Sequence, residues 1–196
     1  MVKVRHARTS RIAAIPLLLS ALLLSALLAA SDSAYVSAKR KFDTIESDRL
    51  PAGTRVEFSP AELTAWAEKE APAGVRNPRL QFGVPEGVTG TALIDFGKVV
   101  KAQGQSPGWL MSRILEGERA VNVTVRIRAA NGRATVDVER VEISGIVVDG
   151  HTLDFLIQNV LLPMYPSAVV GKPFDLGHRI EKLEVRAAGV VVAIGK

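Results

Sequence analysis

Alternating apolar and polar residues dominate the middle and the end of this chain. Because successive side chains of a β-strand point to opposite faces, this alternation predicts strands with one buried and one solvated face. The clearest pair of strands is separated by Asn131-Gly132, which supplies the two positive φ values of a type I′ turn. Three hairpins are therefore predicted, from residues 80–84 with 88–96, from 121–128 with 134–138, and within 179–196.

Two irregularities in the alternation refine this picture. After Val138 the apolar residues shift from even to odd positions, so we expect a β-bulge near residues 139–140 that absorbs one residue and bends the strand. The last strand, at 190–194, is apolar on both faces, which is typical of a strand covered on both sides. The sheet is therefore predicted to be curved, with its final strand in the interior.

A capped helix is predicted directly after a short strand at 54–58. Ser59 is a favourable N-cap, Pro60 fits the first helical position, and Glu62 stands at the capping-box spacing. Pro72 should end this helix. Its predicted apolar stripe consists of Leu63, Trp66 and Ala67, with Glu62, Glu68, Lys69 and Glu70 facing away.

Two more short helices follow, at 109–118 and at 151–162, where Pro163 stops the second. The second of these helices is apolar on both sides. At 3.6 residues per turn, one stripe consists of Leu153, Leu156, Ile157, Val160 and Leu161, while Phe155 and Leu162 lie almost opposite. A single core would need only one stripe, so the second apolar side contacts more protein, a bilayer or a lipid.

The first 30 residues form an export signal peptide or an N-terminal membrane anchor. Four basic residues precede an uncharged run from Ile12 to Ser31, which is about long enough to cross a bilayer as a helix. Residues 31–53 are expected to form a polar helical spacer, and 54–196 the folded domain. The protein is expected to be exported, and either periplasmic or anchored to the inner membrane by residues 12–30, with its body outside the cytoplasm.

These patterns together predict the α+β class. We expect a curved antiparallel β-sheet of about six strands packed against two or three short helices, preceded by an N-terminal hydrophobic helix. Hydrophobic residues make up 47% of the 196 positions, enough for a substantial core.

Charge argues against a nucleic-acid partner. The formal net charge is +5, from 25 Lys and Arg against 20 Asp and Glu. Lys3, Arg5, Arg8 and Arg11 all precede the apolar run, which leaves 21 basic and 20 acidic residues in the rest of the chain. A body so close to neutral lacks the concentrated basic face that binds a phosphate backbone.

Reactive groups are scarce. The absence of cysteine excludes disulfides, thiolate nucleophiles and zinc-thiolate sites. His151 and His178 are interpreted as surface residues, and no serine lies in a nucleophile elbow. The triplet at 95–97 matches the Asp-Phe-Gly of kinases by chance, with Asp95 facing water. We therefore expect no catalytic residues, no metal site and no cofactor, while Trp109 is a candidate for contact with a membrane.

Five segments carry a resemblance to a known family. They are VEFSPAELTAW at 56–66, VEISGIVVDG at 141–150, LDFLIQNVLLP at 153–163, PFDLGHRIEKLEV at 173–185 and AAGVVVAIGK at 187–196. This pattern resembles the LmeA-like phospholipid-binding proteins of the bacterial envelope, relatives of tubular lipid-binding modules in which a strongly bent sheet wraps a long helix. The match covers mainly residues 140–196, with a weaker one at 54–100.

The resemblance implies a domain that binds a phospholipid or an acyl chain without catalysis. One stripe of the helix at 153–162 would then pack on the sheet, and the other apolar positions would border an acyl-chain cavity. The candidates for lining it are Phe155, Leu156, Val160 and Leu162. Three readings stay open: a lipid carrier, a membrane-anchored structural or assembly module that binds another envelope protein through a sheet edge, and a hydrolase with an unrecognised site.

Overall fold

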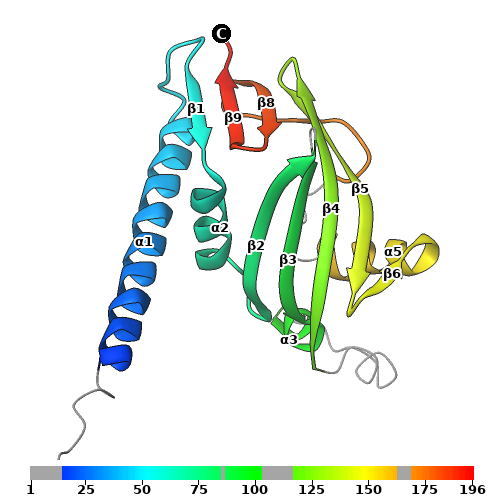
Figure 1. Ribbon diagram of the computed structural model, residues 1–196. Coiled ribbons are helices and arrows are strands. Elements are labelled where there is room, and N and C mark those ends of the chain that lie inside the picture. Colours follow the sequence, from blue (N-terminus) through cyan, green and yellow to red (C-terminus); the bar gives the residue numbers. More distant parts are fainter. Residues whose placement is uncertain (1–14, 85–86, 103–116, 163–168) are drawn as a thin grey trace, which may run out of the picture.

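Two antiparallel sheets form the framework of the protein (Figure 1). The computed structural model describes residues 15–84, 87–102, 117–162 and 169–196, with side chains from residue 31 onward. The larger sheet contains β2 (Val75–Val84), β3 (Gly87–Asp95), β4 (Glu118–Ala130), β5 (Arg133–Ile143) and β6 (Ile146–Val148) in this order, with β7 (Phe174–Asp175) also paired to β5. The smaller sheet has the order β1 (Arg55–Phe58), β9 (Gly189–Ile194), β8 (Ile180–Arg186). The α+β class and the six-stranded antiparallel sheet are confirmed.

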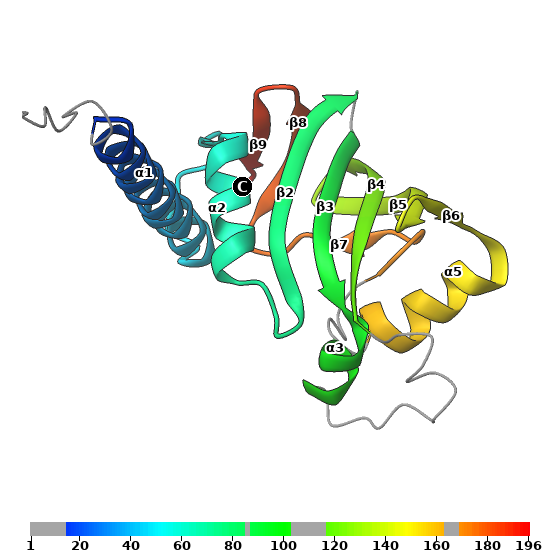
Figure 2. The same ribbon diagram turned by 60° about the horizontal axis from the view of Figure 1, so that its bottom comes forward.

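Local signals in the larger sheet are confirmed residue by residue. Asn131 and Gly132 adopt φ values of 53° and 75°, as the type I′ turn between β4 and β5 requires. Thr124 pairs with Arg140 and the next residue, Val125, pairs with Val138. Glu139 is therefore the extra residue of a β-bulge at the predicted position. The larger sheet is curved, as β2 and β3 show in Figure 2.

The smaller sheet differs from the single sheet that the alternation predicts. β9 pairs with β1 on one side and β8 on the other, so it is the central strand, and most of its residues are buried. The prediction that the last strand is covered on both sides is confirmed. The two sheets meet where the amide of Gly132, at the tip of the β4–β5 hairpin, donates to the carbonyl of Glu181 at 2.8 Å.

Helices α1 (Ile15–Glu46) and α2 (Pro60–Lys69) cover the smaller sheet (Figure 1). The capping box of α2 is formed as predicted, although the helix ends at Lys69, before Pro72. The part of α1 from residue 31 packs against the rest of the fold, since Ala38 and Ile45 are at most 5% exposed. Among the residues whose side chains are described, no helix is both long and apolar enough to cross a membrane.

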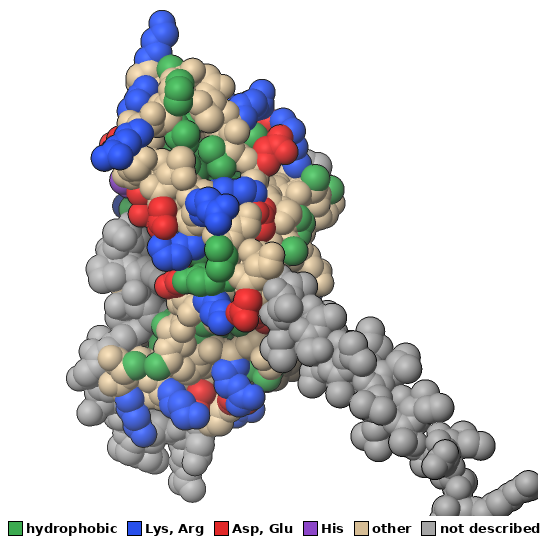
Figure 3. Space-filling view, turned by 90° about the vertical axis from the view of Figure 1, so that its left-hand side faces the viewer, with side chains coloured by type: hydrophobic (Ala, Val, Ile, Leu, Met, Phe, Trp, Pro, Cys, Tyr) green, Lys and Arg blue, Asp and Glu red, His purple; other side chains and the backbone are tan. Residues whose placement is uncertain are grey.

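The hydrophobic core between these helices and the smaller sheet contains Ile45, Phe58, Val192 and Ile194. The ring of Phe42 packs in a tilted arrangement against Phe58, with centroids 4.5 Å apart, and against Trp66 at 4.9 Å. On the outside, seen from the side of α1, positive and negative side chains are interspersed with hydrophobic ones on the described surface (Figure 3). An ion pair between Lys69 Nζ and Asp32 Oδ1, 3.0 Å apart, joins α2 to α1.

Three helical segments lie against the larger sheet: α3 (Phe96–Ala102), α5 (Gly150–Leu156) and η1 (Ile157–Leu161), a π-helical turn that continues α5. The sequence did not predict α3, and the expectation that Asp95 merely faces water is wrong. Its carboxylate accepts a hydrogen bond from the amide of Lys98 at 3.0 Å and so caps the helix. Of the predicted helix at 109–118, residues 109–116 lie outside the described residues, and Glu118 is the first residue of β4.

Candidate functional site

An apolar pocket of about 170 Å³ lies between the larger sheet and the helices beside it. Among the described residues, eleven line it and all of them are apolar. The sheet and α3 contribute Ile94, Phe96, Val121, Val123, Val138, Val141 and Ile143, and the helical segment contributes Leu153, Leu156, Ile157 and Leu161. These described residues include no titratable side chain, so the surface they form is suited to holding an apolar group.

The β-bulge shapes the sheet side of the pocket. In a regular strand Val138 and Val141 would point to opposite faces, because they are three residues apart. The extra residue Glu139 restores the phase, so that both side chains line the pocket. On the opposite face of the same strands, the side chains are polar, as with the hydroxyls of Thr89 and Thr124, which are 3.1 Å apart.

The π-helical turn shapes the other side of the pocket. The amide of Leu162 donates to the carbonyl of Ile157, five residues earlier, which widens the helix in this turn. The side chain of Asn159 donates to the carbonyl of Phe155 at 2.8 Å and occupies an acceptor near the start of the widened turn. π-helical turns are frequent at functional sites, and this one borders the pocket through Ile157 and Leu161.

The structure places the predicted lining residues in different surroundings. Leu156 lines the pocket and packs against the core cluster of Phe96, Val99 and Val121. Phe155 is 39% exposed and Leu162 is half-buried, and neither lines the pocket. The stripe predicted to pack on the sheet is thus the one that borders the pocket. The side chain of Val160, and all of Trp109, lie outside the described residues.

A second pocket, of about 370 Å³, lies on the opposite face of the larger sheet. Its lining mixes Thr91, Asn122 and Glu142 with apolar residues. Glu142 forms an ion pair with Arg140, so its charge is already neutralised within the protein. Although this pocket is larger, it offers neither a continuous apolar surface nor a free charge, and the apolar pocket is the stronger candidate for a binding site.

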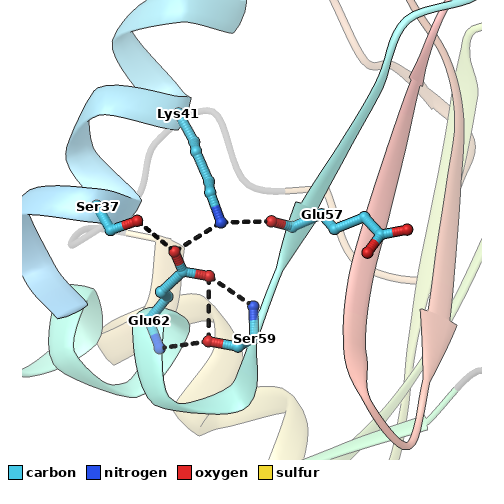
Figure 4. A network of polar contacts seen from close by, with 5 residues as sticks. All are labelled: Ser37, Lys41, Glu57, Ser59 and Glu62. Atoms are coloured by element: carbon cyan, nitrogen blue, oxygen red, sulfur yellow. Dashed lines mark hydrogen bonds and ion pairs between the residues drawn. The ribbon is translucent and has the colours of Figure 1, made fainter.

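The most strongly perturbed carboxylate lies far from both pockets, between α1 and α2 (Figure 4). The carboxylate of Glu62 accepts hydrogen bonds from Lys41 Nζ and Ser37 Oγ, both at 2.6 Å, and from the amide of Ser59 at 2.8 Å. Burial raises the pKa of Glu62, but these donors outweigh it and lower the pKa to about 2. Glu62 therefore joins two helices as a permanent anion and is no proton donor near neutral pH.

This burial corrects the prediction that Glu62 faces away from the apolar side of α2. Glu62 is 9% exposed, whereas Trp66 of the predicted apolar stripe is 36% exposed. The capping-box spacing identified the contact of Glu62 with Ser59 but not the contacts with α1, which come from a distant part of the chain.

Metal and histidine chemistry find little support in the described part of the chain. Within it, no group of three or more His, Asp or Glu side chains is arranged to hold a metal ion. His151 and His178 are both exposed, and Nδ1 of His178 lies 3.5 Å from Oδ1 of Asp48, at the surface. Comparison with protein-family models, curated proteins and solved structures finds no match to this chain.

Proposed function

We propose that this protein is a non-enzymatic envelope protein that binds a lipid or another apolar ligand between its larger sheet and the helical segment α5–η1. The observation that carries the proposal is the pocket of about 170 Å³, whose described lining consists of apolar side chains alone. Engineered apolar cavities of about 150 Å³ stay dry and bind small apolar molecules, so a pocket of this size provides a driving force for binding an alkyl group.

A single acyl chain fits this pocket better than a bulky ligand. Sites for drug-sized molecules are typically about 300–1,000 Å³, well above the volume found here. Each methylene removed from water contributes about 0.8 kcal/mol, so a segment of about five methylenes supplies roughly 4 kcal/mol. The polar head group of a lipid would stay outside, because the described residues of the lining offer no hydrogen-bonding side chain for it.

We also propose that the protein is exported or held at the inner membrane. The uncharged run from residue 12 to residue 30 is proposed to be an exported leader or an N-terminal hydrophobic helix that holds the domain at the inner membrane. A protein held there has direct access to phospholipid. Binding requires no cofactor, because apolar burial alone drives it.

A series of fatty acids of increasing length tests the driving force. Because 0.8 kcal/mol per methylene corresponds to about a fourfold change in affinity, the dissociation constant should fall about fourfold with each added methylene until the pocket is full, and then level off. Isothermal titration calorimetry of the full chain in mild detergent measures this slope. Affinity that does not depend on chain length would contradict the proposal.

A matched pair of variants tests the site. Val123 lines the pocket, whereas the next residue, Thr124, lies on the polar face of the same strand. Val123→Phe should fill the pocket and abolish fatty-acid binding, while Thr124→Phe adds a similar ring elsewhere and should bind like the wild type. Circular dichroism checks that both variants stay folded. Equal binding by the two variants would place the ligand somewhere else.

The runner-up, an assembly module that binds another envelope protein, predicts a different result. In that case the chain purifies without lipid, fatty acids do not bind, and Val123→Phe changes nothing but stability.

A further inference from the structure

Three large apolar side chains stand exposed beside the apolar pocket. Ile146 is 70% exposed, Val147 47% and Phe155 39%. They belong to β6 and α5, and we refer to them together as the β6–α5 rim. Exposed apolar groups of this size on the elements that border an apolar pocket are candidates for contact with a partner or a membrane.

The strand β6 is apolar on both of its faces. In the register of the sheet, Ile146 lies opposite Ile143, which lines the pocket, and Val147 lies opposite Glu142 on the polar face. Ile146 therefore extends the apolar surface of the pocket by one strand, toward the edge of the sheet. Val147 adds an apolar group on the reverse side of the same thin edge.

A protein partner fits this rim poorly. A stable dimer or complex buries about 800 Å² on each side. Three partly exposed side chains offer on the order of a few hundred Å². A folded partner would also cover one face of the edge, whereas Ile146 and Val147 lie on both. A lipid bilayer, which is fluid, can surround a thin edge from both sides.

The backbone of β6 limits how deep the rim could enter. Within the described residues β6 is the last strand of its sheet. Backbone groups without partners are costly in hydrocarbon, so an open sheet edge is excluded from the centre of a bilayer. The boundary between head groups and acyl chains, about 5–10 Å deep, still offers hydrogen-bond partners to such an edge.

The nature of the ligand favours a membrane as well. A ligand with a long acyl chain is almost insoluble in water, so a pocket that takes one needs a surface from which to collect it.

We propose that the β6–α5 rim docks on the surface of a phospholipid bilayer, at head-group depth, and that acyl chains enter the pocket past Ile146. This inference rests on the proposed function and adds the partner surface and the direction of entry.

The absence of cysteine makes a direct test simple, because one introduced thiol can be labelled selectively. In the full chain reconstituted with phosphatidylcholine vesicles, Val147→Cys carries an environment-sensitive fluorophore. Gln81→Cys is the control, since Gln81 is exposed on the polar face of β2, toward the other edge of the sheet. Nitroxide lipids with the quencher near the head group should remove most of the emission at position 147 and little at 81. Lipids with the quencher deep in the bilayer should affect both positions weakly.

A second variant measures the consequence for uptake. Ile146→Ser combined with Val147→Ser removes two exposed apolar groups and leaves the pocket lining intact. Transfer of a fluorescent phospholipid from vesicles should slow at least tenfold, while the affinity for a water-soluble short-chain fatty acid stays at the wild-type value.

The outcomes separate the two proposals. Equal quenching at positions 147 and 81, or an unchanged transfer rate in the double variant, overturns the docking of the rim even if fatty acids bind. Quenching at 147 together with failure of fatty acids to bind would retain the docking and overturn the proposed pocket ligand.

Discussion

The smaller sheet closes its apolar face, whereas the larger sheet leaves part of its face beside a cavity. Phe58, Val192 and Ile194 of the smaller sheet are at most 5% exposed, and α1 and α2 cover them. Val123 and Ile143 of the larger sheet are only partly buried, and both line the pocket of about 170 Å³. The two halves are therefore built from similar apolar strands but differ in how completely their helices fill the space above them.

Side-chain size explains much of this difference. Around the smaller sheet, the ring of Phe42 packs against those of Phe58 and Trp66, and the three fill space between helix and strand. The pocket of the larger sheet is lined by Val, Ile and Leu with one ring, that of Phe96. Interiors normally pack as densely as organic crystals, so a void of this size in the described structure is a feature that a ligand can use.

We call the smaller sheet with α1 and α2 the closed half, and the larger sheet with its pocket the hollow half. The largest effect is expected from shortening a buried side chain in the closed half. Phe58→Ala should lower the free energy of unfolding by about 3–5 kcal/mol, because it removes a buried ring from a filled core. Leu156→Ala, beside the existing pocket, should cost only about 2 kcal/mol, the low end for a leucine. Urea denaturation measures both, and similar losses would show that the two halves are packed equally.

Adding a methyl group to Gly189, in the closed half, should lower the free energy of unfolding almost as much as the loss of the Phe58 ring. Gly189 has φ of 122°, and a Cβ placed there would lie 1.9 Å from the carbonyl oxygen of Phe58. Gly189→Ala should therefore lower the free energy of unfolding by roughly 3 kcal/mol, through overpacking and backbone strain, and loosen the pairing of β1 with β9. Hydrogen exchange of the β1 amides reports the loosening. Wild-type protection there would contradict the close approach of the two strands.

The hydrogen-bonded ion pair of Glu62 in the closed half should make the free energy of unfolding depend on pH in the acidic range. The pKa of Glu62 in the folded protein is about 2, below its ordinary value of 4.5. Its contribution is therefore fully present above about pH 4.5 and is lost as the pH falls toward 2. A shift of this size corresponds to a contribution on the order of 3 kcal/mol.

Glu62→Gln should remove that contribution at neutral pH and flatten the loss of stability between pH 4.5 and 2. Denaturation over this pH range measures the effect, with Glu181→Gln, an exposed carboxylate, as the control. Parallel pH profiles of the wild type and Glu62→Gln would contradict the role of the network.

The smallest effect is expected in the hollow half. Asn159→Ala removes the exposed hydrogen bond to the carbonyl of Phe155 and should cost about 0.5–1 kcal/mol in stability. Because the π-helical turn borders the pocket, affinity for a fatty acid should change more than stability does. If Asn159→Ala alters stability but leaves the affinity for a fatty acid unchanged, the π-helical turn does not contribute to the binding site.

Local signals in the sequence predicted much of the fold. The Asn131-Gly132 turn, the phase shift after Val138 and the capping box at Ser59 each depend on residues close in the chain, and all three are confirmed. The division into two sheets was missed, because it depends on the pairing of β1 with β9 from opposite ends of the domain. Neither alternation nor turn chemistry contains that information.

The candidate site could be predicted only in part. Helical periodicity showed that residues 153–162 have two apolar sides, but it does not say which side meets the sheet. Phe155 therefore proved exposed, while Leu153 and Leu156 line the pocket. The burial of Glu62 was missed for a related reason, since its partners Ser37 and Lys41 lie on a helix whose docking the sequence alone does not reveal.

Native mass spectrometry of the full chain, extracted from membranes in mild detergent, tests the central claim most directly. The wild type and Thr124→Phe should retain a bound phospholipid or fatty acid, and Val123→Phe, with the pocket filled, should lose it. A wild-type chain free of lipid, or equal retention by the two phenylalanine variants, would contradict the assignment of the pocket as a binding site.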